Sequence, residues 1–123
     1  MLEMKPLEDA AQVLKWFQEE KIPFREGCGA FAISERGSLL GFCLFLMGKT
    51  IRILAVRCQE PALLDGLLRA ALNHGSLSQA VEADFSAVTG PMREELGRLG
   101  YLKKDPLPIE WFFAACKPCK GMI

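Results

Sequence analysis

The chain has 123 residues, of which half are hydrophobic and 24% are charged, enough for one domain with its own core. Lys plus Arg and Asp plus Glu both total 15, so the sequence lacks the basic excess that is typical of nucleic-acid binding. The longest apolar run, over 39–47, is too short to span a bilayer. We therefore expect a single cytoplasmic domain over residues 1–123 that binds neither nucleic acid nor a membrane.

The first half of the chain predicts one helix and three strands. The helix is expected to begin near Pro6, a favoured first helical position, and to be stopped by Pro23. Strands are expected over 30–34, 39–47 and 51–56, and the connections between them are short enough to make them antiparallel neighbours. Because the middle strand is apolar at nearly every position, it should be covered on both faces.

The second half predicts a helix–strand–helix order. A leucine-rich helix is expected from Pro61 to a glycine cap at Gly75. The alternating segment 81–88 indicates a strand, which should lie parallel to 51–56 because a helix connects the two. A third helix is expected over 91–99 with Gly100 as its cap, followed by a proline-rich turn and a closing strand over 109–116.

The junction between the strand 51–56 and the helix at Pro61 is the most informative part of the sequence. In many α/β proteins such a junction holds a phosphate with backbone N–H groups and a helix N-terminus. Here the only glycine between Val56 and Leu67 is Gly66, which falls inside the predicted helix. The sequence therefore predicts a phosphate-binding scaffold without a glycine-rich loop.

Two motifs, LAVR at 54–57 running into the leucine-rich helix and ELGRLGY at 95–101, resemble the GNAT acyltransferase superfamily. The order of the predicted elements agrees, and the resemblance covers roughly residues 29–116 of what would be a shortened member. It implies an α/β (α+β) fold with a mixed, mostly antiparallel central sheet and flanking helices. The usual first strand of the family has no counterpart among the predicted elements.

The resemblance implies an acyl-CoA-dependent N-acyltransferase that uses acetyl-CoA or CoA and a small-molecule or peptide amine. The resemblance places the acyl-pantetheine arm of the cofactor along Leu54, Ala55 and Val56. It places the pyrophosphate near Arg57, Gln59 and Ala62. The family's loop follows the pattern R/Q-x-x-G-x-G/A, but here it is about two residues shorter. Pro61 has no N–H and Glu60 brings a negative charge, so this pyrophosphate loop is degenerate.

No catalytic residue is assigned from the sequence. The resemblance places the acid that protonates the leaving thiolate at Leu96, five residues before Tyr101, the only tyrosine in the chain. Glu82, Asp84 and Glu110 are possible bases, although such acids are more often solvated surface groups. The alternative to an enzyme is a non-catalytic module of the same fold that binds a small ligand or a partner protein.

The five cysteines are odd in number and scattered, which favours reduced thiols in a cytosolic protein over a disulfide framework. Cys116 and Cys119 form a C-x-x-C pair, and a thiol or metal function there is a third, weaker option. The pair follows a predicted strand rather than opening a helix, and no second ligand pair accompanies it, so we expect no metal site. In the same segment, Phe112 and Phe113 point to opposite faces of the predicted strand, so one ring needs cover, which a homodimer could provide.

Overall fold

The computed structural model describes residues 2–58, 60–102 and 106–110. The elements are β1 (Leu2–Pro6), α1 (Ala10–Glu19), β2 (Cys28–Glu35), β3 (Ser38–Leu46), β4 (Thr50–Cys58), α2 (Pro61–Leu77), β5 (Glu82–Asp84), α3 (Pro91–Leu99) and β6 (Leu107–Pro108). Within these residues the strands form one six-stranded sheet in the order β1-β2-β3-β4-β5-β6. Every neighbouring pair is antiparallel except β4 and β5, which are parallel. The predicted mixed, mostly antiparallel sheet with flanking helices is confirmed.

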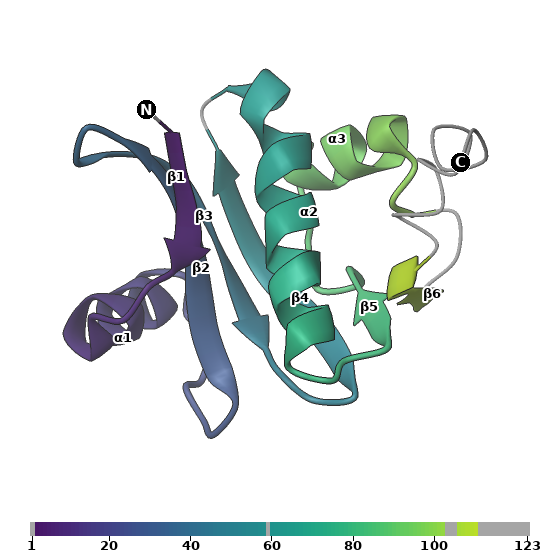
Figure 1. The fold of residues 1–123 in the computed structure, drawn as a ribbon, viewed down its shortest axis with the longest axis horizontal. Coiled ribbons are helices and arrows are strands. Elements are labelled where there is room, and N and C mark those ends of the chain that lie inside the picture. Colours follow the sequence, from purple (N-terminus) through teal and green to yellow (C-terminus); the bar gives the residue numbers. More distant parts are fainter. Residues whose placement is uncertain (1, 59, 103–105, 111–123) are drawn as a thin grey trace, which may run out of the picture.

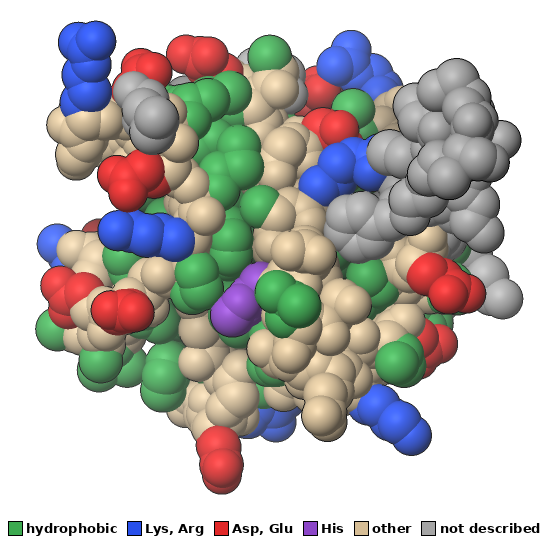
Figure 2. All heavy atoms as spheres, viewed as in Figure 1, with side chains coloured by type: hydrophobic (Ala, Val, Ile, Leu, Met, Phe, Trp, Pro, Cys, Tyr) green, Lys and Arg blue, Asp and Glu red, His purple; other side chains and the backbone are tan. Residues whose placement is uncertain are grey.

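The helices cover both faces of the sheet (Figure 1). On one face, α2 packs its leucines against the sheet in a cluster that also takes Leu96 of α3. On the other face, α1 buries Val13, Trp16 and Phe17 against Leu44 of β3. The predicted cover on both faces of the middle strand is therefore confirmed. Acidic and basic side chains mix around the face seen in Figure 2, with no large cluster of one sign.

The predicted meander of three antiparallel strands is confirmed; β2 and β4 are longer than predicted, and β3 is shifted by one residue. β2 and β3 meet at the turn Arg36–Gly37, where both residues have positive φ values of 52° and 82°. The connection between β3 and β4 contains Gly48 and Lys49, as expected. The short connections hold three consecutive strands side by side and place the end of β4 beside β3.

The predicted start of the first helix near Pro6 is wrong. Residues Leu2–Pro6 form β1, which pairs antiparallel with β2 at the edge of the sheet. The apolar and charged residues of this segment alternate, which is the strand period, and an edge strand tolerates a proline. The helix begins after Asp9, whose carboxylate accepts a hydrogen bond from the Gln12 N–H at 3.2 Å. Residues Leu2–Pro6 thus add an edge strand that the sequence did not predict.

The predicted cap at Gly75 is also wrong, because α2 continues to Leu77. Gly75 lies inside the helix, where a Cβ atom would stand 3.2 Å from Cδ1 of Ile51. Its missing side chain therefore permits a close approach of α2 to β4. The left-handed residue after the helix is Gln79, with φ of 73°.

The parallel pairing of the strands on either side of α2 is confirmed, but β5 is shorter than the predicted 81–88. The carboxylate of Asp84 accepts a hydrogen bond from the Ser86 N–H at 2.8 Å, which turns the chain out of the strand. The third helix and its cap are confirmed, since Gly100 adopts a left-handed φ of 89°.

The last predicted strand, over 109–116, is wrong at its start, because Ile109 and Glu110 are helical and the short β6 precedes them. Proline at 106 and 108 limits how far this strand can extend. Residues 111–116 lie outside the described residues, and so do Phe112, Phe113, Cys116 and Cys119. Among the described helices, none has the length and apolar character needed to cross a membrane.

Candidate functional site

The pairing between β4 and β5 stops early. Only Thr50, Ile51 and Arg52 of β4 pair with β5, whereas β4 continues to Cys58 and keeps its pairing with β3 as far as Gly41. The β5 side of β4 is thus outside the ladder from residue 53 onward. In Figure 1 the two strands diverge at this end, which leaves backbone groups available to an extended ligand.

A β-bulge in β4 marks the point of divergence. Leu44 of β3 pairs with Ala55 and Phe45 pairs with Ile53, so Leu54 is the extra residue. The bulge shifts the alternation of side chains: Ile51, Ile53 and then Val56 join the cluster under α2, while Leu54 and Ala55 pack toward α1. The strand therefore turns as it leaves β5.

A cleft of about 590 Å³ lies at this open end of β4. One wall is the end of β4, from Leu54 to Cys58, with the adjoining part of β3. The opposite wall comes from the segment after β5, including Ala87, Val88 and Met92. The region after α1 closes a third side with Glu20 and Ile22. Most of the lining side chains are apolar and two, Glu20 and Arg57, are charged.

The charged side chains of the cleft are held in one ion pair. Arg57 donates to Glu20 through Nε to Oε2 and through Nη2 to Oε1, both at 2.8 Å. The Arg57 side chain is 62% exposed and that of Glu20 is 17% exposed, so the carboxylate is the more enclosed partner. The hydrogen bond to Glu20, and then the charge of this carboxylate, raise the pKa of Arg57. Among the described residues that line the cleft, Glu20 is the only carboxylate and Arg57 the only cation.

The connection from β4 to α2 is tight. The strand ends at Cys58 and the helix begins at Pro61, with Glu60 as its N-cap. The Glu60 side chain makes no capping hydrogen bond, and its backbone carbonyl accepts from the Leu63 N–H at 2.9 Å. Burial raises the pKa of the Cys58 thiol, which donates to the same carbonyl at 3.2 Å. This thiol, which lines the cleft, is therefore kept protonated.

The residues predicted to hold a cofactor are placed as follows. Four of them, Leu54, Ala55, Val56 and Arg57, line the cleft. Ala62 is exposed on the first turn of α2 and does not line the cleft, and Gln59 lies outside the described residues. Sequence reasoning missed the wall after β5 and the contribution of α1.

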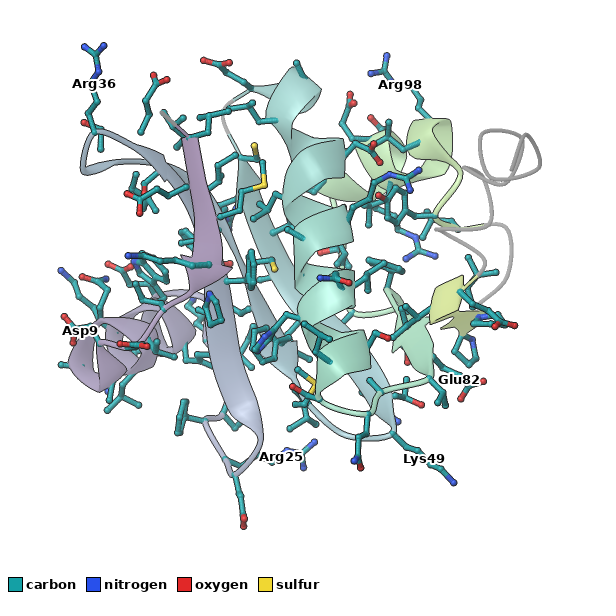
Figure 3. The ribbon with its side chains drawn as sticks, in the orientation of Figure 1. Asp9, Arg25, Arg36, Lys49, Glu82 and Arg98 are labelled. Atoms are coloured by element: carbon teal, nitrogen blue, oxygen red, sulfur yellow. The ribbon has the colours of Figure 1, made fainter. Side chains whose placement is uncertain are left out.

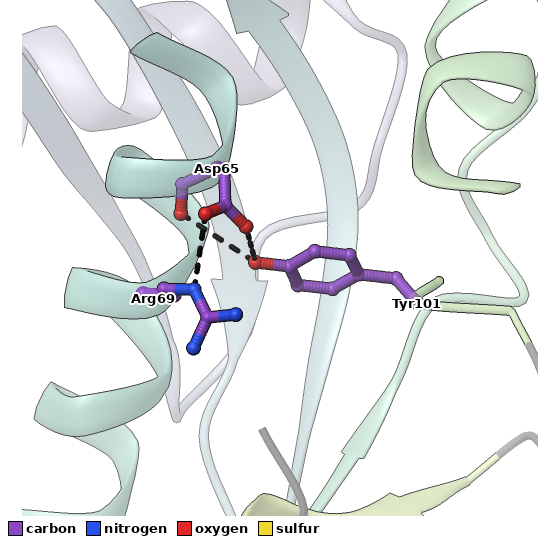
Figure 4. Close-up of polar contacts among 3 residues, drawn as sticks. All are labelled: Asp65, Arg69 and Tyr101. Carbon is purple, nitrogen blue, oxygen red and sulfur yellow. Dashed lines mark hydrogen bonds and ion pairs between the residues drawn. The ribbon is translucent and has the colours of Figure 1, made fainter. Parts of the chain in front are cut away.

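The residue at the implied acid position, Leu96, is fully buried in the core. Tyr101 is also buried, and its hydroxyl donates to Asp65 Oδ1 at 2.6 Å (Figure 4). Arg69 binds the other carboxylate oxygen at 3.0 Å. Burial, followed by the hydrogen bond to Asp65 and the charge of its carboxylate, raises the pKa of Tyr101 well above its usual range. Tyr101 therefore stays protonated and donates a hydrogen bond that joins the end of α3 to α2.

The three possible bases lie outside the cleft lining. Glu82 accepts a hydrogen bond from Thr50 Oγ1 at 3.2 Å, at the end where β4 and β5 are paired. Figure 3 shows Glu82 beside β5 and β6, at the periphery of the molecule. Asp84 holds the turn after β5, and Glu110 is exposed. Among the described residues, the only carboxylate at the cleft is that of Glu20, which comes from the end of α1, where no sequence signal distinguished it from a solvated surface acid.

No metal centre is formed by the described residues, since none of their His, Cys, Asp and Glu side chains gather in groups of three or more. Cys28, Cys43 and Cys58 are free thiols. Burial raises the pKa of Cys43 to about 12, so this thiol stays protonated within the core. The C-x-x-C pair falls in the part of the chain that the structure leaves undescribed.

No protein-family model and no curated protein matches this sequence. Solved structures do match. An IAA acetyltransferase from Bacillus cereus superimposes over 81% of this chain and 76% of its own, with a TM-score of 0.60 and 14% identity. A protein from Desulfovibrio desulfuricans assigned to the GNAT acetyltransferase family does so over 81% and 84%, with a TM-score of 0.58 and 13% identity.

A tandem GNAT protein from the clavulanic acid biosynthesis pathway matches over 81% of this chain and 43% of its own, with a TM-score of 0.52 and 11% identity. These proteins are described as acetyltransferases or as GNAT proteins. Their strands and helices are arranged as in this chain. At such identities the likeness concerns the fold. The protein has the fold of the GNAT acetyltransferase superfamily.

Proposed function

We propose that this protein is an acyl-CoA-dependent N-acyltransferase whose acyl thioester lies in the cleft at the open end of β4. The observation that supports this most is the early end of the β4–β5 ladder, followed by the bulge at Leu54 and a cleft of about 590 Å³. An extended arm with amide groups, such as pantetheine, could pair with strand backbone that β5 does not use. The acetyltransferase neighbours point to the same ligand class.

In this proposal the chain acts mainly by positioning its two substrates. A neutral primary amine attacks the thioester carbonyl, a C–N bond forms, and the C–S bond breaks to release the thiolate. The proton lost by the amine passes to solvent or to the thiolate. The described cleft residues include no tyrosine, and their one carboxylate, Glu20, is paired with Arg57. Backbone N–H groups near the bulge would polarise the carbonyl.

A second candidate, a non-catalytic module that binds an acyl thioester or a related small ligand, is favoured by one observation. The position expected to supply an acid holds the buried Leu96, and the hydroxyl of Tyr101 is committed to Asp65. Because the described cleft residues include no tyrosine and no unpaired carboxyl group, the cleft suits binding as well as it suits slow transfer.

Calorimetry and an acyl-transfer assay with the same protein separate the two candidates. Acetyl-CoA is titrated into the full chain, and release of free thiol is then followed with a panel of small primary amines and an amine-bearing peptide. Ala87→Trp places a large side chain at an exposed position of the cleft wall, and Ala11→Trp makes the same change on an exposed position of α1 away from it.

We expect binding and turnover that saturate with both substrates, lost in Ala87→Trp and retained in Ala11→Trp. Binding without turnover for every amine would support the module. Absence of binding of any acyl thioester at millimolar concentration would contradict both candidates.

A further inference from the structure

The ion pair at the cleft bears on which thioester donors the site accepts, an inference that rests on the proposed function. Arg57 is the side chain best placed to meet a phosphate, since it is the only cation among the described residues that line the cleft. Glu20 already takes two of its N–H groups in a forked contact at 2.8 Å each. The guanidinium charge is thus compensated within the protein.

The Glu20 carboxylate also stays near any phosphate that Arg57 would bind. Its side chain is only 17% exposed and it lines the same cleft. A phosphate drawn to Arg57 must therefore either displace this carboxylate or lie beside it, and two anions in close contact repel each other. Arg57 offers hydrogen bonds but no free positive charge.

The start of α2 offers little compensation. Its N-cap, Glu60, carries a second negative charge, and Pro61 lacks the N–H that a residue at this position would present. The connection from Cys58 to Pro61 is too short to wrap a diphosphate with successive backbone N–H groups. These three features at the start of α2 weaken attraction for phosphate.

The rest of the cleft suits a neutral ligand. Its side chains include Phe42, Leu54, Val56 and Met92, which favour an uncharged arm, while the unpaired edge of β4 suits amide groups. We infer that Glu20 is a donor-specificity residue. By holding Arg57, it makes the site recognise the neutral pantetheine arm of an acyl thioester and gain little from the phosphates of CoA.

The test compares two donors by calorimetry on the full chain: acetyl-CoA and S-acetyl-pantetheine, which lacks the phosphates. For the unmodified protein we expect dissociation constants within about threefold of each other. Glu20→Gln removes the carboxylate charge and should strengthen acetyl-CoA binding by about five- to tenfold, the order of one net hydrogen bond, while leaving S-acetyl-pantetheine unchanged. Adding Arg57→Gln to Glu20→Gln should abolish this gain.

The matched control is Glu19→Gln, which makes the same charge change at the neighbouring exposed position at the end of α1. It should alter neither affinity by more than about twofold, since exposed charges are screened. A preference of the unmodified protein for acetyl-CoA of more than about tenfold would overturn this inference and leave the proposed function standing, even if Glu20→Gln did not fold. An unchanged acetyl-CoA affinity in folded Glu20→Gln would also overturn the role of Glu20 and leave the proposed function standing. If neither donor binds, the proposed function fails and this inference fails with it.

Discussion

The two ends of β4 show how one strand serves both the fold and the cleft. At its first end, Thr50 to Arg52 pair with β5, and Arg52 also pairs with β3. Ile51 is fully buried under α2. At its last end, from Leu54 to Cys58, only β3 remains as a partner and several side chains are half-exposed. The first end of β4, here called the closed end, is held between β3 and β5. The last end, the open end, has no strand of the described sheet on its β5 side.

The difference between these ends arises from a few local features. The turn that Asp84 stabilises ends β5 after three residues. The pairing of β4 with β5 therefore stops at Arg52. The bulge at Leu54 then changes which side chains face α2. Stability should therefore depend mostly on the closed end and ligand binding mostly on the open end.

The largest expected effect is on the closed end. Ile51→Ala should lower the free energy of unfolding by about 2–5 kcal/mol, because Ile51 is fully buried and a cavity would remain between β4 and Gly75. Leu54→Ala, three residues along the same strand, should cost less than about half of that, since Leu54 is only partly buried. Urea unfolding followed by circular dichroism measures both variants.

Binding provides the reverse comparison for the same two variants. Leu54→Ala should weaken binding of an acyl thioester, and folded Ile51→Ala should not. Equal losses of stability in both variants would show that the two ends of β4 are not distinct.

The next effect concerns Gly41, which lies beside the open end. A Cβ atom there would stand 2.8 Å from the backbone oxygen of Arg57 and 3.2 Å from Cα of Cys58. Because these are backbone atoms, β3 and β4 must shift, and Gly41→Ala should cost about 1–3 kcal/mol of stability. Gly48→Ala is the control, since its Cβ atom would meet only Thr50 O at an ordinary 3.6 Å. Thermal unfolding of both variants would show whether the close approach of β3 to β4 requires glycine at position 41.

Much of the fold could be predicted because local patterns were strong. The short connections fixed the meander from β2 to β4, and the leucine stripe predicted α2. Failures occurred where a tertiary contact overrode a local signal. Pro6 suggests a helix start but ends an edge strand that β2 holds in place, and Gly75 suggests a cap but serves a close contact with Ile51.

The candidate site could be predicted only along the chain segment that carries the resemblance. Residues 54–57 form a continuous motif, and they do line the cleft. Glu20 lies 37 positions before Arg57 in the sequence, and nothing local signals that the two meet. Such a contact depends on where the end of α1 packs against the sheet, which composition and periodicity do not specify.

A smaller effect is expected from Tyr101→Phe. The variant loses the hydroxyl that donates to Asp65 Oδ1 at 2.6 Å, and we expect a loss of about 1–2 kcal/mol because water can partly replace the donor at this half-exposed carboxylate. The acyl-transfer rate of the folded variant should stay unchanged, because this hydroxyl lies outside the cleft lining. A large fall in the rate constant with little loss of stability would make Tyr101 a catalytic acid after all.

The pH dependence of stability provides an independent check on Tyr101. Its pKa is raised in the folded state, so the protonated phenol favours folding, and this contribution is fully present below the unfolded pKa of about 10. As the pH rises above that value, the unfolded state loses a proton that the folded state retains, and stability falls. The fall above about pH 10 should be shallower in Tyr101→Phe, as measured by urea unfolding at a series of alkaline pH values.

The smallest effect is expected at the start of α2. Glu60 is exposed, makes no side-chain capping hydrogen bond, and lies where a phosphate near the helix N-terminus would feel its charge. Glu60→Gln should strengthen acetyl-CoA binding by about two- to threefold at low salt and by less at 0.15 M salt, because exposed charges are screened. Binding of S-acetyl-pantetheine should not change, since that donor carries no phosphate. A gain that is the same for both donors, or that does not fall with salt, would show that Glu60 acts through the shape of the connection between β4 and α2 and not through its charge.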